Sequence, residues 1–253
     1  MNPARDLVSL TPMATFVLVH GGGHGGWCYQ KVARLLRDAG HDAYTPTLTG
    51  LGERSHLLFP DIDLDTHITD VVNVLTYEGL HDAFVVGHSY GGMVITGVGD
   101  RAADRIAGLV YLDAANPVDG QSLVDVAGPI ILATREDLRV INGVECVLHP
   151  APEAPLFFGV TDPDDVAWMA ERLTSHPWAC FEQPLHLTDE SALAKMPKYQ
   201  IVCTSTLATR DPALMEEYRS AGRLWDIDTG HDLMITEPQK VADALEAIAA
   251  DPI

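Results

Sequence analysis

Short apolar runs alternate with helical periodicity along most of the chain. Continuous apolar runs at 15–20, 82–87, 106–113 and 199–204 have the length and composition of strands buried on both faces. Residues 27–39 instead repeat apolar side chains at helical spacing, with Val32, Leu35 and Leu36 on one face. Strands that alternate with helices in this way predict an α/β fold, a mostly parallel central sheet flanked by helices.

The pattern changes between about residue 117 and residue 190. Prolines interrupt this segment repeatedly, at Pro117, Pro129, Pro150, Pro152, Pro155, Pro163 and Pro177. We predict that 117–190 is a small, mostly helical cap inserted after the 106–113 strand, and that 14–116 and 191–253 form the core. Residues 1–13 are predicted to be an N-terminal extension, with Met13 as an alternative start.

The formal net charge of −20 argues against polyanionic partners. Proteins that bind nucleic acid or an anionic membrane surface usually carry a basic patch. No apolar run approaches the roughly 18–20 residues that span a bilayer, and no signal peptide is recognisable, so a cytoplasmic location is predicted. The four scattered cysteines lack metal-ligand spacing and indicate reduced thiols. Whether the chain forms a homodimer is left open.

The sequence Gly87-His88-Ser89-Tyr90-Gly91 lies between a predicted strand and a helix expected to run from Ser89 to about Arg101. A G-x-S-x-G pattern in this context predicts a nucleophile elbow, a sharp turn that projects the serine hydroxyl above the sheet. At the N-terminus of a helix the hydroxyl also lies where developing negative charge is favoured. Ser89 is therefore the candidate nucleophile.

A second glycine-rich turn, His20 to Trp27, follows the 15–20 strand. Its glycines also satisfy the dinucleotide pattern G-x-G-x-x-G, but the next strand ends without the carboxylate that would bind a ribose. We therefore predict neither a cofactor nor a metal, and interpret the turn as an oxyanion hole of the HGGG type. Its two donors are expected to be the backbone N–H groups of Gly22 and Tyr90.

A serine nucleophile needs a base, and His231 has the best sequence context among the eleven histidines. It lies in a loop between a late strand and the last helix, which fits the chain order Ser, Asp, His of these hydrolases. His24, within the glycine-rich turn, is expected to shape the substrate pocket, and His88 to pack beside the nucleophile.

Four segments together resemble the α/β-hydrolase superfamily, in the branch of plant methylesterases, hydroxynitrile lyases and bacterial carboxylesterases such as pyrethroid hydrolases. They are FVLVHGGGHGGWCY, PTLTGLGERSHL, VVGHSYGGMVI and DTGHDLMITEP. The resemblance implies an esterase with a lidded, largely apolar pocket. Hydroxynitrile lyases of this branch carry threonine directly after the first motif histidine and lysine directly after the catalytic one. Gly21 and Asp232 at those positions argue against lyase activity.

The acid of the triad is the least obvious member. Plant members of the branch place an aspartate at a position that falls near Thr206 in this chain, where no carboxylate is present. Asp211, in the same loop, is also well placed to cap a helix, and Asp228 would have to fold back sharply toward His231. Asp113 ends the buried 106–113 strand, at the sheet edge where ligands bind in open α/β folds. We predict Asp113 as the acid, with Asp211 as the runner-up.

The resulting hypothesis is a serine hydrolase that cleaves a carboxylic ester or lactone with a hydrophobic or aromatic moiety. His24, Trp27, Phe158 and Trp178 are the predicted substrate-binding residues. Two alternatives share the fold. One is a cofactor-independent oxygenase or lyase that uses a His–Asp dyad, and the other is a non-catalytic member that binds a small ligand.

Overall fold

The computed structural model describes residues 13–250 and contains a six-stranded sheet in the order β2-β1-β3-β4-β8-β9. The strands are β1 (Thr15–Val19), β2 (Asp42–Tyr44), β3 (Ala83–His88), β4 (Ile106–Leu112), β8 (Lys198–Cys203) and β9 (Leu224–Ile227). Every neighbouring pair is parallel. The predicted parallel α/β sheet is confirmed.

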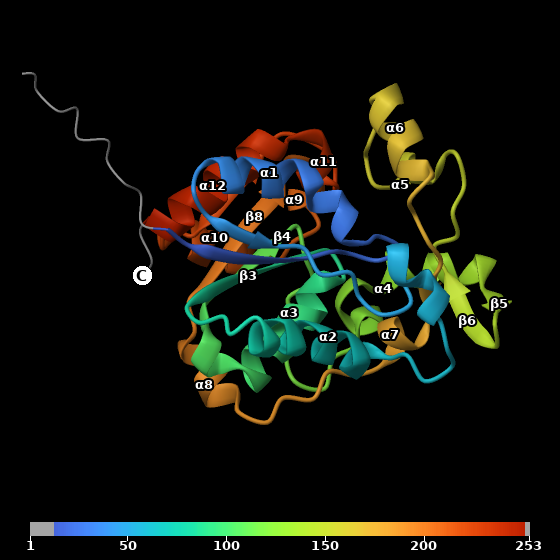
Figure 1. The fold of residues 1–253 in the computed structure, drawn as a ribbon, viewed down its shortest axis with the longest axis horizontal. Helices are drawn as coiled ribbons and strands as arrows, with labels where there is room; N and C mark the ends of the chain where they lie inside the picture. Colours follow the sequence, from blue (N-terminus) through green and yellow to red (C-terminus); the bar gives the residue numbers. More distant parts are fainter. Residues whose placement is uncertain (1–12, 251–253) are drawn as a thin grey trace, which may run out of the picture.

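Helices cover both faces of the sheet (Figure 1). One face carries α1 (Gln30–Asp38), α11 (Leu233–Thr236) and α12 (Pro238–Ala250), and the other carries α2 (Leu64–Tyr77), α3 (Gly91–Arg101) and α8 (Glu190–Lys195). Successive strand residues alternate between the two resulting cores, because side chains along a strand point to opposite faces. Phe16 and Leu18 pack into the α1–α12 core, whereas Val17 and Val19 pack into the α2–α3 core.

Shorter elements connect these layers. They are the 3₁₀ turns η1 (Gly26–Tyr29), η2 (Gly52–Leu57) and η3 (Ala103–Arg105), and the helices α9 (Thr204–Leu207) and α10 (Pro212–Ser220). Two predicted helices begin later than expected. The helix predicted over 27–39 starts as η1, and the one predicted from Ser89 starts at Gly91, because Ser89 has a φ of 55°, outside the right-handed helical region.

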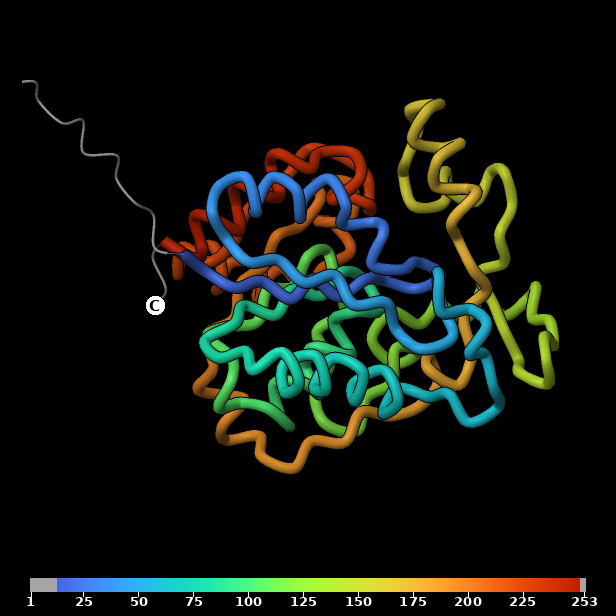
Figure 2. Tube along the Cα trace, viewed as in Figure 1, coloured from blue at the N-terminus to red at the C-terminus, as the bar shows by residue number. Residues whose placement is uncertain are grey.

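Part of the predicted cap, residues 117–190, lies beyond one end of the central sheet, where Figure 1 labels α5, α6, β5 and β6 and Figure 2 traces the same segment in yellow-green to yellow. The predicted cap contains α4 (Leu123–Thr134), η4 (Arg135–Asp137), α5 (Ala154–Phe157), α6 (Pro163–Ala170) and α7 (Ala179–Glu182). It also contains an antiparallel sheet of β5 (Arg139–Ile141), β6 (Val144–Val147) and β7 (His176–Pro177), which the expectation of a mostly helical cap missed. The domain boundaries at 116/117 and 190/191 remain predictions.

Apart from Met13, the predicted N-terminal extension lies outside the described residues. Within residues 13–250 no helix is both long enough and apolar enough to span a bilayer. The cysteines at 28, 146, 180 and 203 are all buried, free thiols.

Candidate active site

Ser89 stands at a sharp turn between β3 and α3, in the left-handed backbone conformation that non-glycine residues rarely adopt. The flanking glycines make this turn sterically feasible. A Cβ at Gly87 would lie 2.5 Å from the Gly91 carbonyl oxygen, and a Cβ at Gly91 would lie 2.8 Å from the Val19 carbonyl oxygen. The Ser89 side chain is partly exposed while its neighbours His88 and Tyr90 are buried. The geometry is that of the predicted nucleophile elbow.

Asp113 follows β4, the strand next to β3 in the sheet. The two strand ends are tied together, because the Ala115 N–H donates to the Ser89 carbonyl over 3.0 Å. The Asp113 N–H donates to the Ile201 carbonyl of β8 over 2.7 Å. Asp113 has a φ of 46°, so the backbone turns sharply here too. Its carboxylate is buried at the carboxyl edge of the sheet.

His231 lies in the loop between β9 and α11 and faces Asp113. Its Nδ1 is 2.5 Å from Asp113 Oδ2. The backbone of the same residue is held from the other side, since His88 Nε2 donates to the His231 carbonyl over 3.0 Å. The rings of His88 and His231 are 4.7 Å apart between centroids. The structure therefore brings His231 and Asp113 together beside the residue that precedes Ser89.

The Asp113 carboxylate also accepts from donors at the end of β8 and in the segment after it. Thr206 Oγ1 and Arg210 Nη2 each donate to Asp113 Oδ1 over 2.6 Å. The Cys203 N–H lies 3.4 Å from the same oxygen, and the Cys203 thiol donates to Oδ2 over 3.1 Å. None of these donors was predicted to act at the site.

The surroundings lower the pKa of Asp113 and raise the pKa of His231. Burial alone would raise the pKa of Asp113, but the hydrogen bond and charge of His231, the charge of Arg210 and the Thr206 hydroxyl hold it well below its usual range. Burial alone would lower the pKa of His231, but the bond to the Asp113 carboxylate more than offsets this and raises it above its usual value. The pair is thus a carboxylate with a strongly basic imidazole.

The other two aspartates considered from the sequence are occupied elsewhere. Asp211 caps α10, where its Oδ1 accepts from the Ala213 N–H over 2.9 Å. Asp228 accepts from the Thr204 hydroxyl over 2.8 Å. Both side chains are exposed and neither is paired with His231. Among the three candidates, Asp113 is the one that the fold brings to the histidine.

The N–H groups of Gly22 and Tyr90 have no protein acceptor within the described residues. The peptide that follows Gly22 is held at both ends by buried histidines. His24 Nδ1 donates to the Gly22 carbonyl over 2.7 Å, and the Gly23 N–H donates to His176 Nδ1 over 3.2 Å. The cap residue Thr174 adds a bond from its N–H to the Gly23 carbonyl, over 2.8 Å. The turn is thus fixed with the Gly22 N–H unpaired among the described residues, and the Tyr90 N–H at the elbow is unpaired there too. That the two donors form an oxyanion hole remains a prediction.

His24 also pairs with Asp232, the residue after His231, over 2.8 Å from Nε2 to Oδ2. Both side chains are fully buried. Both ring nitrogens of His24 lie within hydrogen-bond distance of oxygen atoms, Nδ1 of the Gly22 carbonyl and Nε2 of the Asp232 carboxylate. Burial opposes the charge of Asp232, but the charge and hydrogen bond of His24 hold its pKa below the usual value. This ion pair joins the glycine-rich turn to the histidine loop, a link between residues 208 positions apart.

Two of the predicted substrate-binding residues surround His24. Trp27 stacks on its ring at 5.4 Å between centroids, and Phe158 of the cap meets it edge-on at 4.8 Å. Trp178 lies elsewhere in the cap, buried, with Arg135 over its ring and its indole N–H on Glu182. The roles of all four residues in binding remain predictions.

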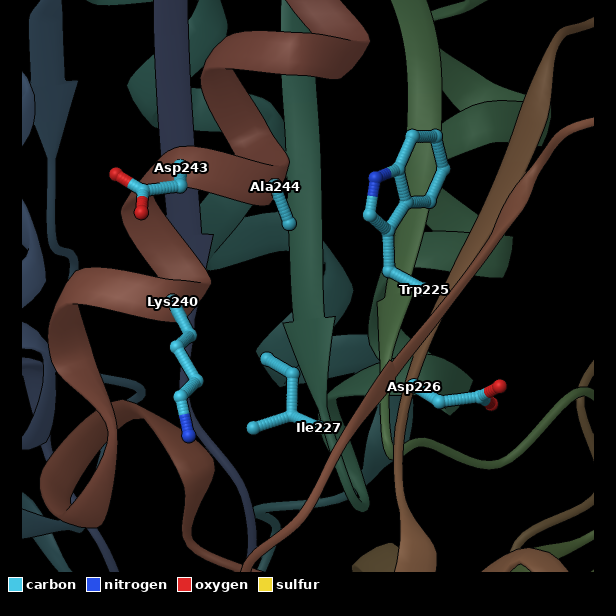
Figure 3. A pocket seen from close by; sticks show the side chains of 6 residues that line it. All are labelled: Trp225, Asp226, Ile227, Lys240, Asp243 and Ala244. Carbon is cyan, nitrogen blue, oxygen red and sulfur yellow. The ribbon is translucent and has the colours of Figure 1, made fainter.

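Two hollows lie at different distances along the fold from the glycine-rich turn, one beside it and one between β9 and α12. One of about 280 Å³ lies between the glycine-rich turn and the cap, lined in part by Gly23, Leu148, Phe157 and Phe158. The other lies between β9 and α12 and is lined by Trp225, Asp226, Ile227, Lys240, Asp243 and Ala244 (Figure 3). The second contains none of the predicted site residues. The first includes Phe158 in its walls, and neither hollow is lined by Ser89, His231 or Asp113.

A buried trio, His67, His176 and Cys180, places potential metal-ligand atoms within 4.8 Å of one another. These groups already serve the hydrogen-bond network behind Tyr90. The Tyr90 hydroxyl donates to His67 Nδ1 over 2.9 Å, and His67 Nε2 donates to the Thr49 carbonyl over 3.0 Å. Burial also raises the pKa of the Cys180 thiol, which disfavours the thiolate that binds metals. A metal ion at this trio would have to displace the Tyr90 hydroxyl or break the bond to Thr49.

Comparison with known proteins agrees with this geometry. Residues 16–244 match the alpha/beta hydrolase family. A carbendazim hydrolyzing esterase from Nocardioides sp. (strain SG-4G) is 39% identical over 253 residues, which cover 93% of this chain and 100% of that protein. Salicylic acid-binding protein 2 from Nicotiana tabacum is 28% identical over 271 residues, covering 92% and 96%.

Among solved structures, the methylesterase protein MES16 from Arabidopsis superimposes with a TM-score of 0.72 at 23% identity, covering 94% of this chain and 99% of that one. At that identity the likeness shows the fold alone. The curated relatives, bacterial and plant, confirm both the predicted branch and the prediction of an esterase. With the family match spanning nearly the whole core and cap, the chain belongs to the alpha/beta hydrolase family.

Proposed function

We propose that the protein hydrolyses carboxylic esters through a triad of Ser89, His231 and Asp113. The observation that carries the proposal is the bond from His231 Nδ1 to Asp113, in a histidine whose ring packs against His88, the residue before Ser89. This bond leaves Nε2 as the ring nitrogen that can accept a proton. This is the arrangement in which a carboxylate fixes the tautomer of a base for a serine nucleophile.

The chemistry follows from these roles. His231 accepts the Ser89 proton as Oγ attacks the ester carbonyl carbon, and the oxyanion binds the Gly22 and Tyr90 N–H groups. The C–O bond to the alcohol then breaks as His231 returns the proton to the leaving oxygen. Water, activated by His231, attacks the acyl-enzyme and releases the acid and free Ser89. Asp113 stabilises the imidazolium in both steps without taking a proton.

The substrate class is inferred from the cap side of the glycine-rich turn. Trp27 and Phe158 present aromatic surface there, and the adjoining hollow of about 280 Å³ has mostly apolar walls, including Leu148, Phe157 and Leu173. This supports an ester or lactone with a hydrophobic or aromatic moiety. Carbendazim, which the Nocardioides relative is named for hydrolysing, belongs in the substrate screen together with aryl esters, alkyl esters and lactones.

The test is Ser89→Ala against a short p-nitrophenyl ester, with fluorophosphonate labelling followed by mass spectrometry. We expect the variant to lose turnover and labelling, because no other group supplies the attacking oxygen. Ser220→Ala is the matched control, since Ser220 is exposed on α10 and bonds only to Glu216 within the described residues.

Retained turnover by Ser89→Ala would overturn the proposal. It would favour the alternative of an oxygenase or lyase with a His–Asp dyad, which does not need Ser89. A wild-type protein that neither turns over any ester nor takes the label would favour a non-catalytic ligand-binding member.

A further inference from the structure

Arg210 places a cation directly against the acid of the proposed triad. It lies between α9 and α10, and its guanidinium makes two bonds at the end of β4. Nη2 donates to Asp113 Oδ1 and Nη1 donates to the Ala114 carbonyl, each over 2.6 Å. The side chains are 18% and 0% exposed for Arg210 and Asp113. Solvent therefore screens this pair far less than an ion pair at the surface.

Arg210 and His231 share one negative charge. His231 is hydrogen-bonded to Oδ2 of Asp113, whereas Arg210 and Thr206 donate to Oδ1. A guanidinium on one oxygen withdraws charge from the other and repels a second cation nearby. Arg210 therefore opposes the strong hold that Asp113 has on the proton of His231. Within the described residues Asp113 is also the one carboxylate with which Arg210 forms a salt bridge.

The other groups around His231 leave this role to Arg210. Asp232, the next residue, pairs with His24, and its negative charge raises the pKa of His231 as Asp113 does. His88 packs against His231, but burial lowers the pKa of His88 to about 3. His88 is therefore uncharged near neutral pH. The Cys203 thiol donates to the same oxygen of Asp113 as His231 does. Among these neighbours, Arg210 is the cation that contacts the same carboxylate as His231.

We propose that Arg210 is a positioning residue that weakens the hold of Asp113 on the His231 proton and so extends the base's working range to lower pH. The proposal rests on the proposed function in that His231 serves as the base. It differs from a purely structural role in one respect: loss of the charge changes the pH at which the enzyme works, and not the rate once His231 is neutral.

The experiment compares wild type, Arg210→Met and Arg210→Lys by two readouts. The first is kcat/KM for a p-nitrophenyl ester across pH. The second is the NMR titration of the His231 ring, identified by its absence in His231→Gln. Arg219→Met is the matched control, because Arg219 lies on α10 and pairs with Asp226 and Glu216 instead of the triad. Thermal unfolding checks that each variant is folded.

We expect Arg210→Met to move both the rising limb of kcat/KM and the His231 titration to higher pH by about one unit. On the rising limb that is about a tenfold loss, and the high-pH plateau stays near the wild-type value. Arg210→Lys keeps the charge and should restore most of the shift, while Arg219→Met should leave both curves in place.

An unchanged limb with a lowered plateau in folded Arg210→Met would overturn the proposal, because Arg210 would then only hold the loop. Since thiols titrate in the same range, Cys203→Ala must keep the limb, and loss of the limb in that variant would also count against it. The NMR shift is measurable without turnover. A shifted His231 in a chain that cleaves no ester would support the role of Arg210 while refuting the esterase.

Discussion

The loops after β4 and β8 bring different groups to the pair of His231 and Asp113. The β4 loop holds a carboxylate, Asp113, and presents it to His231. The β8 loop, where the resemblance places the acid, has a hydroxyl at Thr206 and a cation at Arg210, and both donate to Asp113. The absence of an aspartate at the position of Thr206 therefore does not indicate a decayed enzyme. What matters is which strand end can bring an oxygen to the histidine.

The largest effect is expected from removing the acid. Asp113→Asn should lower kcat/KM by about 10⁴-fold, because an amide can fix the wrong tautomer of the base and cannot stabilise the imidazolium. Asp211→Asn, on the other loop, should stay within about twofold, since that carboxylate caps α10. Steady-state kinetics on the two purified variants decides the comparison, and the reverse ranking would return the acid to the β8 loop.

A smaller effect should follow from moving the acid back. In the Asp113→Asn background, Thr206→Asp places a carboxylate where the wild-type hydroxyl contacts Asp113. We expect roughly tenfold recovery of kcat/KM relative to Asp113→Asn alone, since the loop is shaped around the correct position but not optimised for it. Thr206→Asn in the same background is the neutral control. Equal rates for the two double variants would show that the β8 loop cannot hold the acid in this chain.

The smallest effect concerns the donors. Thr206→Val removes one hydrogen bond to the Asp113 carboxylate and keeps the shape of the side chain. A hydrogen bond to a charged group contributes about 1.5–3 kcal/mol, and Arg210 still donates to the same oxygen in the variant. Because only part of this energy is then lost in the transition state, kcat/KM should fall by about tenfold or less. Thr204→Val is the control, because Thr204 bonds to Asp228 and not to the triad. Loss as large as that of Asp113→Asn would mean that the loop itself collapses.

The parallel sheet, the sharp turn at Ser89 and the contact of Asp113 with His231 could be predicted because each has a local signal. Asp113 is a charge at the end of a fully apolar strand, and such a charge needs a partner. Its donors could not be predicted from the chain, because the contact of Thr206 and Arg210 with Asp113 depends on the pairing of β4 with β8 across more than 90 positions. The His24–Asp232 pair could not be predicted either, because the two residues are 208 positions apart in the chain.

The small sheet of the cap was missed although one signal was present. Asn142 and Gly143 both have positive φ and form the turn between β5 and β6. Asn-Gly between two apolar-alternating segments is a strong hairpin indicator. The strands themselves are too short for periodicity to stand out, and the frequent prolines suggested interrupted helices. Here the turn residues were more informative than the strands.

Thr174 and His176 of the predicted lid are hydrogen-bonded to Gly23 in the glycine-rich turn, so the lid cannot be exchanged without affecting that turn. In many engineering schemes the lid of a hydrolase is exchanged as a cassette to alter selectivity. In this chain the lid also supplies two of the bonds that orient the glycine-rich turn. A chimera that replaces 117–190 with a foreign lid would change the pocket and would also lose the two hydrogen bonds to Gly23. Keeping residues 174–176 from the original chain is the minimal graft that separates the two effects.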